Sequence, residues 1–500
     1  MTWRTASLVG IALITFFAFA YTPISDSDFW WHIAAGKWIV EHGALPTTDP
    51  FGMYSAADTV RNDTVLRGQW LGQVVLYEMF TLGGSAGVVT LRALLLSGCL
   101  GLLFWRARRL GAVAWASWAV LLPSGLLALG FTNDRPQLFS YLLAALLFLV
   151  LENYARSRAH GWLWVLPLIA VVWANTHGAF LLAVALLPLY IAALWANARQ
   201  QKNFAAQHRG LALATLAFLP ATLLNPNGLT TYAYLFSLEG SALQAATSEY
   251  ISSFALYQLG NILPQLWIAM LYILAMIACV GLWRHDRTRL VLVIFLGVIG
   301  AWSYRYLAFM IFIAGPYLAV GLTQALKFQP RVAIPHYGIA VLLLLAVLAI
   351  TAGVQSGMAL RSDVNRSMFP VAALDALGDK NISGKIFNHM QWGGYLQWRL
   401  SSAAHLYVDG RMLDSTRLEP YRHILWATPV GIEWLRHEQF SVVMLPPSNR
   451  FTGERYALID YLRVQPEWAM AYRDSNAVVF IRRGEGGGAL PTPTSAMPVQ

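Results

Sequence analysis

Long apolar runs dominate the chain and predict a bundle of membrane-spanning helices. A helix needs about 20 mostly apolar residues to cross a hydrocarbon core of roughly 30 Å. Runs of this kind lie near 3–21, 86–105, 112–131, 137–154, 162–176, 179–197, 210–224, 263–283, 290–304, 306–325 and 337–354. The pattern predicts a polytopic α-helical membrane protein with about eleven transmembrane helices, which makes residues 1–354 the transmembrane domain.

The connections between these runs alternate between basic and nearly uncharged ones. Basic residues follow every second run, at Arg106, Arg108, Arg109, Arg156, Arg158, Arg199, Lys202, Arg209, Arg284, Arg287, Arg289, Lys327 and Arg331. Lysine and arginine are enriched in cytoplasmic loops. We therefore expect a cytoplasmic N-terminus, with the first loop (22–85) and the C-terminal segment on the outer side. Tyr21-Thr22-Pro23-Ile24 offers no signal-peptide cleavage site, so the first run is expected to remain as a helix.

The outer segments carry patterns of their own. In the first loop, apolar residues at helical spacing between Asp28 and His42 predict an amphipathic helix at the membrane surface, and a second helix is expected over 70–82. After residue 369, strands are expected at 385–388, 405–409, 441–445 and 477–482, and helices at 419–426, 432–438 and 455–463. Residues 355–483 are thus predicted to form an extracytoplasmic α/β domain, followed by a disordered tail at 484–500.

Composition supports a membrane protein and bears on how the positive net charge is interpreted. The 500 residues are 57% hydrophobic and 12% charged, whereas a soluble domain has roughly 25% charged residues. The net charge of +10 could indicate nucleic acid binding, but membrane topology already accounts for where the basic residues lie. The two cysteines lie in apolar runs and predict neither a disulfide framework nor a metal site.

The first candidate for chemistry is Asp26-Ser27-Asp28, directly after the first apolar run. Paired carboxylates near a membrane surface shift each other's pKa, which suits a general base or a metal ligand. His32 lies one helical turn after Asp28 and would share its face of the helix. The alternative is that Asp26 or Asp28 only caps the helix that follows. Spacing alone does not separate these interpretations.

Three further acids lie in the same loop. Asp49 stands in the turn sequence Thr48-Asp49-Pro50, where an ordered turn would hold it as a second acid. For Asp58 and Asp63 a solvated surface position is the favoured interpretation.

A third group of polar residues lies near the outer ends of the apolar runs: Arg92, Arg135, Asn175, His177 and Arg305. Charge near the bilayer is costly and marks a pathway, an ion pair or an anionic ligand. Arg135 could simply pair with Asp134, and His177 could be a histidine that joins two helices. Arg305, on the side that otherwise lacks basic residues, suits bidentate contact with a phosphate.

Two motifs in the C-terminal segment follow expected strands, where α/β domains build their sites. They are Asn388–Leu396, with its Gly393-Gly394 pair, and Val408-Asp409-Gly410-Arg411. The favoured interpretation is structural: the glycines allow tight packing, and Asp409 pairs with Arg411 to fix a turn.

These residues resemble those of bacterial membrane glycosyltransferases of the GT-C type. The similarity rests on DSDFWWHIAAGKWIVEHGALPTTDPF, GQWLGQVVLYEMF, WANTHGAF, LLNPNG, SYRYLAF, WGGYL and VDGR, which extend over nearly the whole chain. The layout is more distantly similar to oligosaccharyltransferase catalytic subunits and protein O-mannosyltransferases. The chain lacks the WWDYG motif of oligosaccharyltransferase, which argues against recognition of a peptide sequon.

The resemblance implies a transferase in the bacterial inner membrane that moves a sugar from a polyprenyl phosphate to an extracytoplasmic acceptor. Asp26 or Asp28 would be the base or would organise a divalent metal such as Mg or Mn, and Asp49 would be a second acid. Arg305, Arg135 and His177 would face the donor phosphate, and membrane lipids would surround the helices. Two other functions stay open: a non-catalytic scaffold, and a lipid or solute transporter. A transporter would be expected to carry ionisable residues at mid-membrane, and these are scarce in the apolar runs here.

Overall fold

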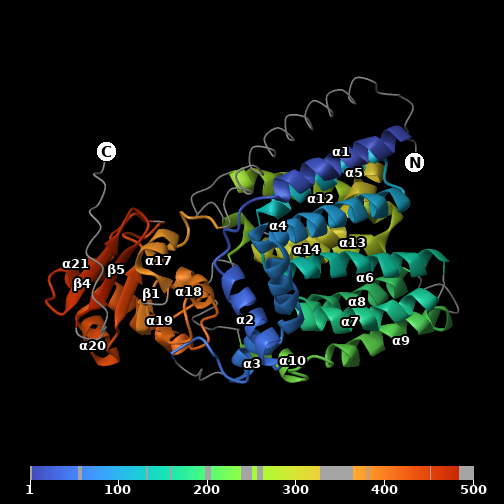
Figure 1. Ribbon diagram of the computed structural model, residues 1–500. Helices are drawn as coiled ribbons and strands as arrows, with labels where there is room; N and C mark the ends of the chain where they lie inside the picture. Colours follow the sequence, from blue (N-terminus) through green and yellow to red (C-terminus); the bar gives the residue numbers. More distant parts are fainter. Residues whose placement is uncertain are drawn as a thin grey trace. The chain divides into compact units, whose positions relative to one another are not determined.

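The fold is given by a computed structural model (Figure 1), in which the chain divides into two compact units. The structure describes residues 3–53, 59–130, 133–157, 160–197, 204–237, 251–255, 263–326, 364–379, 382–450 and 452–483. The helical unit is Met1–Thr22 with Leu82–Arg361, and the mixed unit is Pro23–Thr81 with Ser362–Gln500. The expected span at 337–354, Asp58 and the expected tail at 484–500 lie outside the described residues.

The helical unit consists of apolar helices joined by short connections. Its described helices are α1 (Trp3–Ala20), the second part of α4 (Trp70–Arg109), α5 (Ala114–Leu129), α6 (Gln137–Ser157), α7 (Val165–Thr176), α8 (Phe180–Asn197), α9 (Phe204–Thr222), α10 (Thr230–Ser237), α12 (Leu263–His285), α13 (Arg287–Trp302), α14 (Leu307–Phe309) and α15 (Gly315–Ala325). One apolar core runs through them, and α6 to α9 lie side by side (Figure 1).

The described helices confirm an integral membrane protein. Five of them are long enough and apolar enough to cross a bilayer, at Trp70–Arg109, Gln137–Ser157, Phe180–Asn197, Gln265–His285 and Tyr304–Ala325. Val9–Ala20 and Ala114–Leu129 are shorter apolar helices. The number of about eleven crossings, and the side of the membrane that each end occupies, stay predictions.

Helix α4 is one element in sequence but bends sharply at two glycines. Gly83 and Gly84 leave the helical conformation, with φ, ψ of −147°, 16° and 57°, −149°. The positive φ of Gly84 is one that glycine adopts without steric cost. The bend falls where the chain passes from the mixed unit to the helical unit.

Small residues let α12 and α15 approach closely. A methyl group added at Gly281 would overlap the backbone of Gly321, and one added at Gly321 would overlap the backbone of Ala278. Lipid tails are as apolar as leucine, so membrane helices associate largely through close packing of this kind.

A buried arginine supports a π-helix in the same unit. The guanidinium of Arg106 is fully buried and pairs with Glu152 of α6, with Nη2 2.7 Å from Oε1. It also donates to the carbonyls of Phe312 and Ile313, each at 3.4 Å. These residues belong to the π-helical turn Met310–Ala314, whose wider winding changes the regular carbonyl pairing.

The mixed unit is built on a five-stranded sheet. Its strands are β1 (Gly384–Asn388), β2 (Ala404–Leu406), β3 (Val442–Leu445), β4 (Trp468–Arg473) and β5 (Val478–Arg482), in the order β2-β1-β3-β5-β4. β1 pairs in parallel with β2 and β3, whereas β5 is antiparallel to β3 and β4. The expected strands 385–388, 405–409, 441–445 and 477–482 are confirmed with small shifts, and β4 was missed.

Helices surround this sheet in the same unit. They are α2 (Phe29–His42), α3 (Thr59–Arg67), the first part of α4, α17 (Val371–Leu377), α18 (Gly393–Arg399), α19 (Leu418–Leu425), α20 (Pro429–Glu438) and α21 (Ala457–Arg463). The expected helices 419–426, 432–438 and 455–463 are confirmed as α19, α20 and α21, and α3, α17 and α18 were not foreseen.

The first loop belongs to the mixed unit and extends its sheet. Gly52 forms a parallel bridge with Leu406 at the outer side of β2, and the N–H of Met53 donates to the carbonyl of Leu406 at 3.1 Å. Segments more than 350 positions apart in the sequence therefore share one fold.

The prediction of a surface amphipathic helix at 28–42 is right about the helix and wrong about its surroundings. Every residue of α2 from Phe29 to Gly36 is buried, so its first two turns are covered on all sides. Gly36 lies so close to α4 that a methyl group there would overlap the carbonyl of Gln73. Trp30 and Trp31 are therefore core residues of the mixed unit, whereas Trp38 is half-buried.

Candidate functional site

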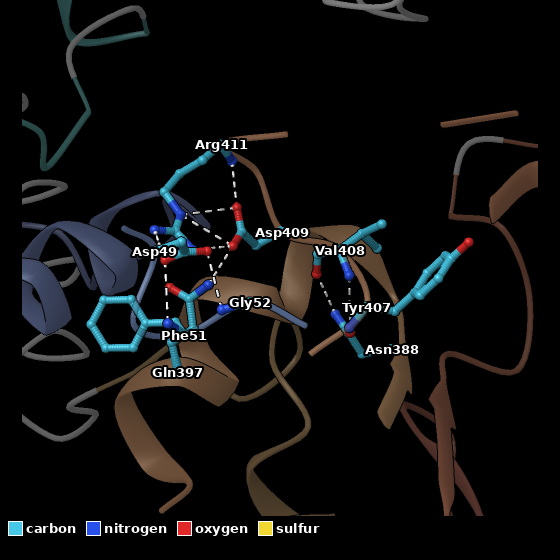
Figure 2. A network of polar contacts seen from close by, with 9 residues as sticks. All are labelled: Asp49, Phe51, Gly52, Asn388, Gln397, Tyr407, Val408, Asp409 and Arg411. Carbon is cyan, nitrogen blue, oxygen red and sulfur yellow. Dashed lines mark hydrogen bonds and ion pairs between the residues drawn. The ribbon is translucent and has the colours of Figure 1, made fainter. Parts of the chain in front are cut away.

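The turn Asp409–Arg411, which follows β2, brings together three buried charged residues of the mixed unit, Asp49, Asp409 and Arg411 (Figure 2). Arg411 forms a two-pronged ion pair with Asp49 of the first loop, with Nη1–Oδ1 at 2.8 Å and Nη2–Oδ2 at 3.0 Å. The same guanidinium contacts both oxygens of Asp409 through Nε, each at 3.1 Å. Only 2% of the Arg411 side chain and 6% of the Asp49 side chain are exposed. Asp49, Asp409 and Arg411, which we call the clamp, thus form an ion-pair network that is almost fully buried.

Asp49 also orders its own loop. Its Oδ1 accepts the N–H of Phe51 at 3.2 Å, and its Oδ2 accepts the N–H of Gly52 at 3.0 Å. The ordered turn expected at Asp49 is present. Because both carboxylate oxygens already accept from Arg411 and from the backbone, the geometry favours a structural role for this acid.

The charge state of the clamp follows from its partners. Burial disfavours the charged form of Asp409, but the charge of Arg411 and hydrogen bonds from Arg411 and Gln397 hold the pKa of Asp409 below its usual range. Burial likewise opposes the charge of Arg411, and the neighbouring Asp409 and Asp49 raise the pKa of Arg411 overall. Asp409 and Arg411 are therefore both charged at neutral pH.

Asp28 contacts the same turn from the other side. A methyl group at Gly410 would overlap Oδ1 of Asp28, so that carboxylate lies directly against the glycine backbone. Asp28 is the N-cap residue of α2, yet its side chain accepts no capping hydrogen bond. Capping, the alternative role for Asp28, is therefore not what holds this side chain in place.

Asp26 does have the local role that the alternative described. Its Oδ1 accepts the N–H of Asp28 at 3.0 Å, which closes a turn before α2. The two acids of the motif are thus distinguished: Asp26 shapes the backbone, and Asp28 is presented to the 409–411 turn.

The two glycines of the Asn388–Leu396 motif allow α18 to approach these acids. A methyl group at Gly393 would lie 2.5 Å from Cβ of Asp409, and one at Gly394 would lie 2.9 Å from the Ser27 carbonyl oxygen and the Trp31 nitrogen. Larger residues at either position would push α18 away from the start of α2. The structural interpretation of this motif, tight packing, is confirmed.

Asn388 fixes the backbone that leads into the turn (Figure 2). This fully buried amide at the end of β1 accepts from the N–H of Tyr407 at 3.1 Å and donates to the carbonyl of Val408 at 2.7 Å. The side chain thereby holds the chain between β2 and Asp409. Asn388 belongs to the motif singled out in the sequence, whereas Gln397, which donates to Oδ2 of Asp409, was missed because no local pattern marks this contact.

His32 is buried inside the mixed unit. Its ring packs on Trp31, with ring centroids 3.5 Å apart, and its Nδ1 lies 3.4 Å from Nε2 of Gln73 on α4. Only 2% of the residue is exposed, which favours positioning of α2. Substrate contact by His32 stays a prediction.

In the helical unit, Arg92 has a defined partner. Its Nη1 lies 2.6 Å from Oδ2 of Asp134, its Nε donates to the Ala20 carbonyl at 3.0 Å, and its Nη2 donates to Oγ1 of Thr22 at 2.9 Å. Asp134 therefore pairs with the distant Arg92, and a pairing of Asp134 with its neighbour Arg135 stays a prediction. Arg92 thus connects the end of α1, α4 and the 133–136 turn. Arg135, the residue after Asp134, is half-buried.

His177 lies at the end of α7 and contacts α6. Its Nδ1 is 2.9 Å from Oγ of Ser140, and that hydroxyl accepts the indole N–H of Trp173 at 2.8 Å. The N–H of Ala179 also donates to Nδ1, at 3.2 Å. Nδ1 is thus an acceptor, which assigns the ring proton to Nε2. The interhelical interpretation of His177 is confirmed.

Asn175 and Arg305 lie in other parts of the helical unit. The side-chain amide of Asn175 donates to the carbonyls of Val171 at 2.8 Å and Leu224 at 3.1 Å, which joins α7 to the end of α9. Arg305 is half-buried in the short turn Tyr304–Tyr306, whose first N–H donates to the Ile251 carbonyl at 3.1 Å. Contact of Arg92, Arg135, Asn175, His177 or Arg305 with a substrate stays a prediction.

The residues do not form a metal site within the described part of the chain. There, no group of three His, Cys, Asp or Glu side chains is arranged to hold an ion. Among the described acids of the first loop, Asp49 pairs with Arg411, and Asp26 accepts a backbone N–H. A divalent metal, which the resemblance allowed, stays a prediction.

Comparison with known proteins identifies the fold. No protein-family model and no curated protein matches the chain. Among solved structures, ArnT from Cupriavidus metallidurans in the apo state is similar with a TM-score of 0.58 and 15% identity, over 95% of this chain and 97% of that chain. The same protein bound to undecaprenyl phosphate gives a TM-score of 0.54 and 16% identity, over 97% and 99% of the two chains.

An archaeal enzyme is similar at the same level. The oligosaccharyltransferase of Archaeoglobus fulgidus gives a TM-score of 0.56 and 10% identity, over 88% of this chain and 69% of that chain. At these identities the likeness establishes a fold in common with these GT-C glycosyltransferases, as the sequence resemblance implied.

Proposed function

We propose that the protein is a membrane glycosyltransferase that moves a sugar from a polyprenyl-phosphate donor to an extracytoplasmic acceptor. The observation that carries this proposal is a fold likeness to ArnT that extends over nearly the full length of both chains. One of the ArnT structures holds undecaprenyl phosphate, and the Archaeoglobus fulgidus enzyme is described in complex with a dolichol-phosphate. A lipid-linked phosphate is therefore the donor class that we assign here, with the apolar helical unit embedded in the membrane.

Asp28 is the residue that we assign as general base. In the transfer, the acceptor hydroxyl oxygen forms a bond to the anomeric carbon, the bond from that carbon to the donor phosphate oxygen breaks, and the hydroxyl proton passes to a carboxylate. The other two candidate acids have defined structural roles, because Asp26 closes a turn and Asp49 pairs with Arg411. Asp28 is the one that the Gly410 backbone holds without a capping bond.

The helical unit supplies the candidates for stabilising the leaving phosphate. A phosphate that departs with negative charge is stabilised by arginine and by N–H donors. Arg305, Arg135 and the Nε2–H of His177 have this chemistry.

The decisive experiment compares two isosteric variants with a matched control. A deletion strain is complemented with wild type, Asp28→Asn, Asp26→Asn or Glu433→Gln, and the envelope glycans are analysed by mass spectrometry. Glu433 is an exposed acid of α20, so its variant removes the same charge from the same unit. We expect Asp28→Asn to reproduce the deletion profile, Asp26→Asn to retain partial transfer, and Glu433→Gln to restore it fully.

Two outcomes would contradict the proposal at different levels. Full complementation by Asp28→Asn would remove the base assignment while leaving the enzyme class intact. If deletion itself changes no glycan or lipid-linked sugar, the transferase function fails, and a scaffold becomes the better interpretation. Binding of undecaprenyl phosphate, measured as thermal stabilisation in detergent, should be the same for wild type and Asp28→Asn, because the variant removes a base and leaves the helical unit unchanged.

A further inference from the structure

A basic cavity lies among the helix ends of the helical unit, apart from every residue discussed above as a candidate for sugar transfer. Its volume is about 290 Å³, and it is bounded by the end of α4, by α6, α8 and α15, and by the start of α13. Arg109, Arg156 and Arg289 line it, together with Glu152 and Asp286. All three arginines belong to the connections whose basic character predicts the cytoplasmic side.

The charges in this cavity do not cancel. Glu152 is matched by Arg106, whose Nη2 lies 2.7 Å away. Asp286 is matched by Arg289, with Nε–Oδ2 at 3.2 Å, and it also caps α13 by accepting the N–H of Arg289 at 3.0 Å. Two carboxylates are thereby neutralised by two arginines, and the remaining lining charges are both positive.

Those remaining charges are Arg109 and Arg156. Both are exposed, and neither has a carboxylate partner among the residues that the structure describes. The guanidinium of Arg109 lies 4.9 Å over the ring of Trp105, which directs it without neutralising it. Two unmatched guanidinium groups therefore share one cavity.

The walls of the cavity are suited to a bound group with both polar and apolar parts. Tyr190 and Tyr317 are buried and line it, and the Arg289 guanidinium lies 5.8 Å over the Tyr317 ring. The first N–H groups of α13, beside Thr288, add the positive end of a helix dipole. The volume lies at the lower limit of small-molecule pockets, about 300–1,000 Å³, which suits a headgroup and not a whole lipid.

We propose that this cavity binds a phosphate-bearing anion through Arg109 and Arg156, of the kind that an anionic phospholipid headgroup presents. Arginine binds phosphate oxygens in a bidentate geometry. Basic pockets between membrane helices on the cytoplasmic side are suited to anionic headgroups. The inference is independent of the proposed transferase activity, because it concerns residues at the basic ends of the helices.

The test measures ligand-dependent thermal stability of the full-length protein in detergent. The probes are phosphatidylglycerol, zwitterionic phosphatidylcholine and inorganic phosphate. The variant Arg109→Gln/Arg156→Gln removes the two unmatched charges. Its control, Arg284→Gln/Arg287→Gln, removes two exposed arginines from a neighbouring basic connection that do not line the cavity.

We expect phosphatidylglycerol to raise the Tm of wild type and of the control, and phosphatidylcholine to have no effect. Each arginine contributes about 1 kcal/mol to the free energy of binding an anionic headgroup. The cavity variant should therefore bind phosphatidylglycerol roughly 25-fold more weakly than wild type. Arg109→Lys/Arg156→Lys, which keeps the charge but not the fork, should bind with intermediate strength. If inorganic phosphate alone gives the same arginine-dependent shift, the phosphate site is supported with a soluble anion as occupant.

Two results would overturn the inference. An equal loss of binding in the cavity variant and in the control would indicate general surface attraction. An unchanged phosphatidylglycerol shift in the cavity variant would show that Arg109 and Arg156 do not contact the headgroup. Because the arginines are exposed and lack carboxylate partners in the described residues, the variant should fold, and its Tm without lipid checks this.

Discussion

Replacing Arg411 with methionine should destabilise the mixed unit more than any exposed arginine substitution in it. The change removes the guanidinium and leaves Asp49 and Asp409 buried, with 6% and 9% of their side chains exposed. Breaking a buried ion pair by removing one partner costs about 3–5 kcal/mol, because the remaining charge is uncompensated. For a unit of roughly 200 residues, 1 kcal/mol shifts Tm by about 2–4 °C, so the expected loss is roughly 6–20 °C.

The assay is thermal unfolding of the full-length protein in detergent, followed by tryptophan fluorescence. Arg422→Met, an exposed arginine of α19, is the control and should shift Tm by about 2 °C or less. The pH dependence supplies a second check. In wild type the depressed pKa of Asp409 contributes stability above the unfolded value near 3.9, and this contribution is lost as the pH falls through the folded pKa.

Without Arg411, burial would instead raise the pKa of Asp409, so the carboxyl group can take up a proton as the solution becomes acidic. The difference in stability between wild type and Arg411→Met should therefore shrink from pH 7 towards pH 4. A penalty no larger than that of Arg422→Met, or one that stays constant over this pH range, would refute the account of the clamp as a buried charge network.

Asp49→Asn then separates a structural from a catalytic role. If Asp49 serves Arg411, the Asp49→Asn and Arg411→Met variants share one interaction, and their stability losses should couple by about 1–3 kcal/mol in a double-mutant cycle. Sugar transfer should fall only as far as folding falls. Additive stability losses, together with loss of transfer in a stable Asp49→Asn protein, would return Asp49 to the role of second acid.

Two further outcomes follow from the packing and from the titration of the molecule. Gly281→Ala or Gly321→Ala should lower the Tm of the helical unit by several degrees. Gly98→Ala, where a methyl group has open space, is the control and should leave the Tm nearly unchanged. Melting curves followed by circular dichroism in detergent check both outcomes. Burial, and the charge of Arg450, lower the pKa of His389 to about 4, so stability should fall between pH 6.5 and 4 by at most about 3 kcal/mol. His389→Gln should reduce this acid sensitivity in a pH series of melts.

The helical unit was largely predictable because its signal is local. A run of about 20 apolar residues specifies a membrane helix with little reference to the rest of the chain. Helices α1, α6, α8 and α12 begin and end close to the expected positions. The pairing of Arg92 with Asp134 was not predictable, because 42 positions separate the two residues and Asp134 has an arginine next to it.

In the mixed unit the elements were more predictable than their surroundings. The periodicity of Asp28–His42 specifies a helix, but burial of its whole first half depends on α18 and α4, which lie far away in sequence. Strand β4, Trp468–Arg473, was missed because it alternates only weakly between buried and exposed positions and pairs with β5 alone. Edge strands carry less of the hydrophobic alternation that identifies a strand.

The two aspartates of the first motif show most clearly where sequence reasoning ends. In Asp26-Ser27-Asp28 either acid has the right position to cap a helix or to act as a base, and their local sequences differ little. The distinction comes from the C-terminal segment: Gly410, Gly393 and Gly394 bring the 409–411 turn and α18 against the start of α2. The Asp26 carboxylate accepts the N–H of Asp28, whereas the Asp28 carboxylate lies against Gly410 of the distant VDGR motif. A role for Asp28 in chemistry thus depends on the VDGR motif as much as on its own motif. Gly410→Ala should therefore displace the Asp28 carboxylate and impair its function, although both aspartates are kept in the sequence.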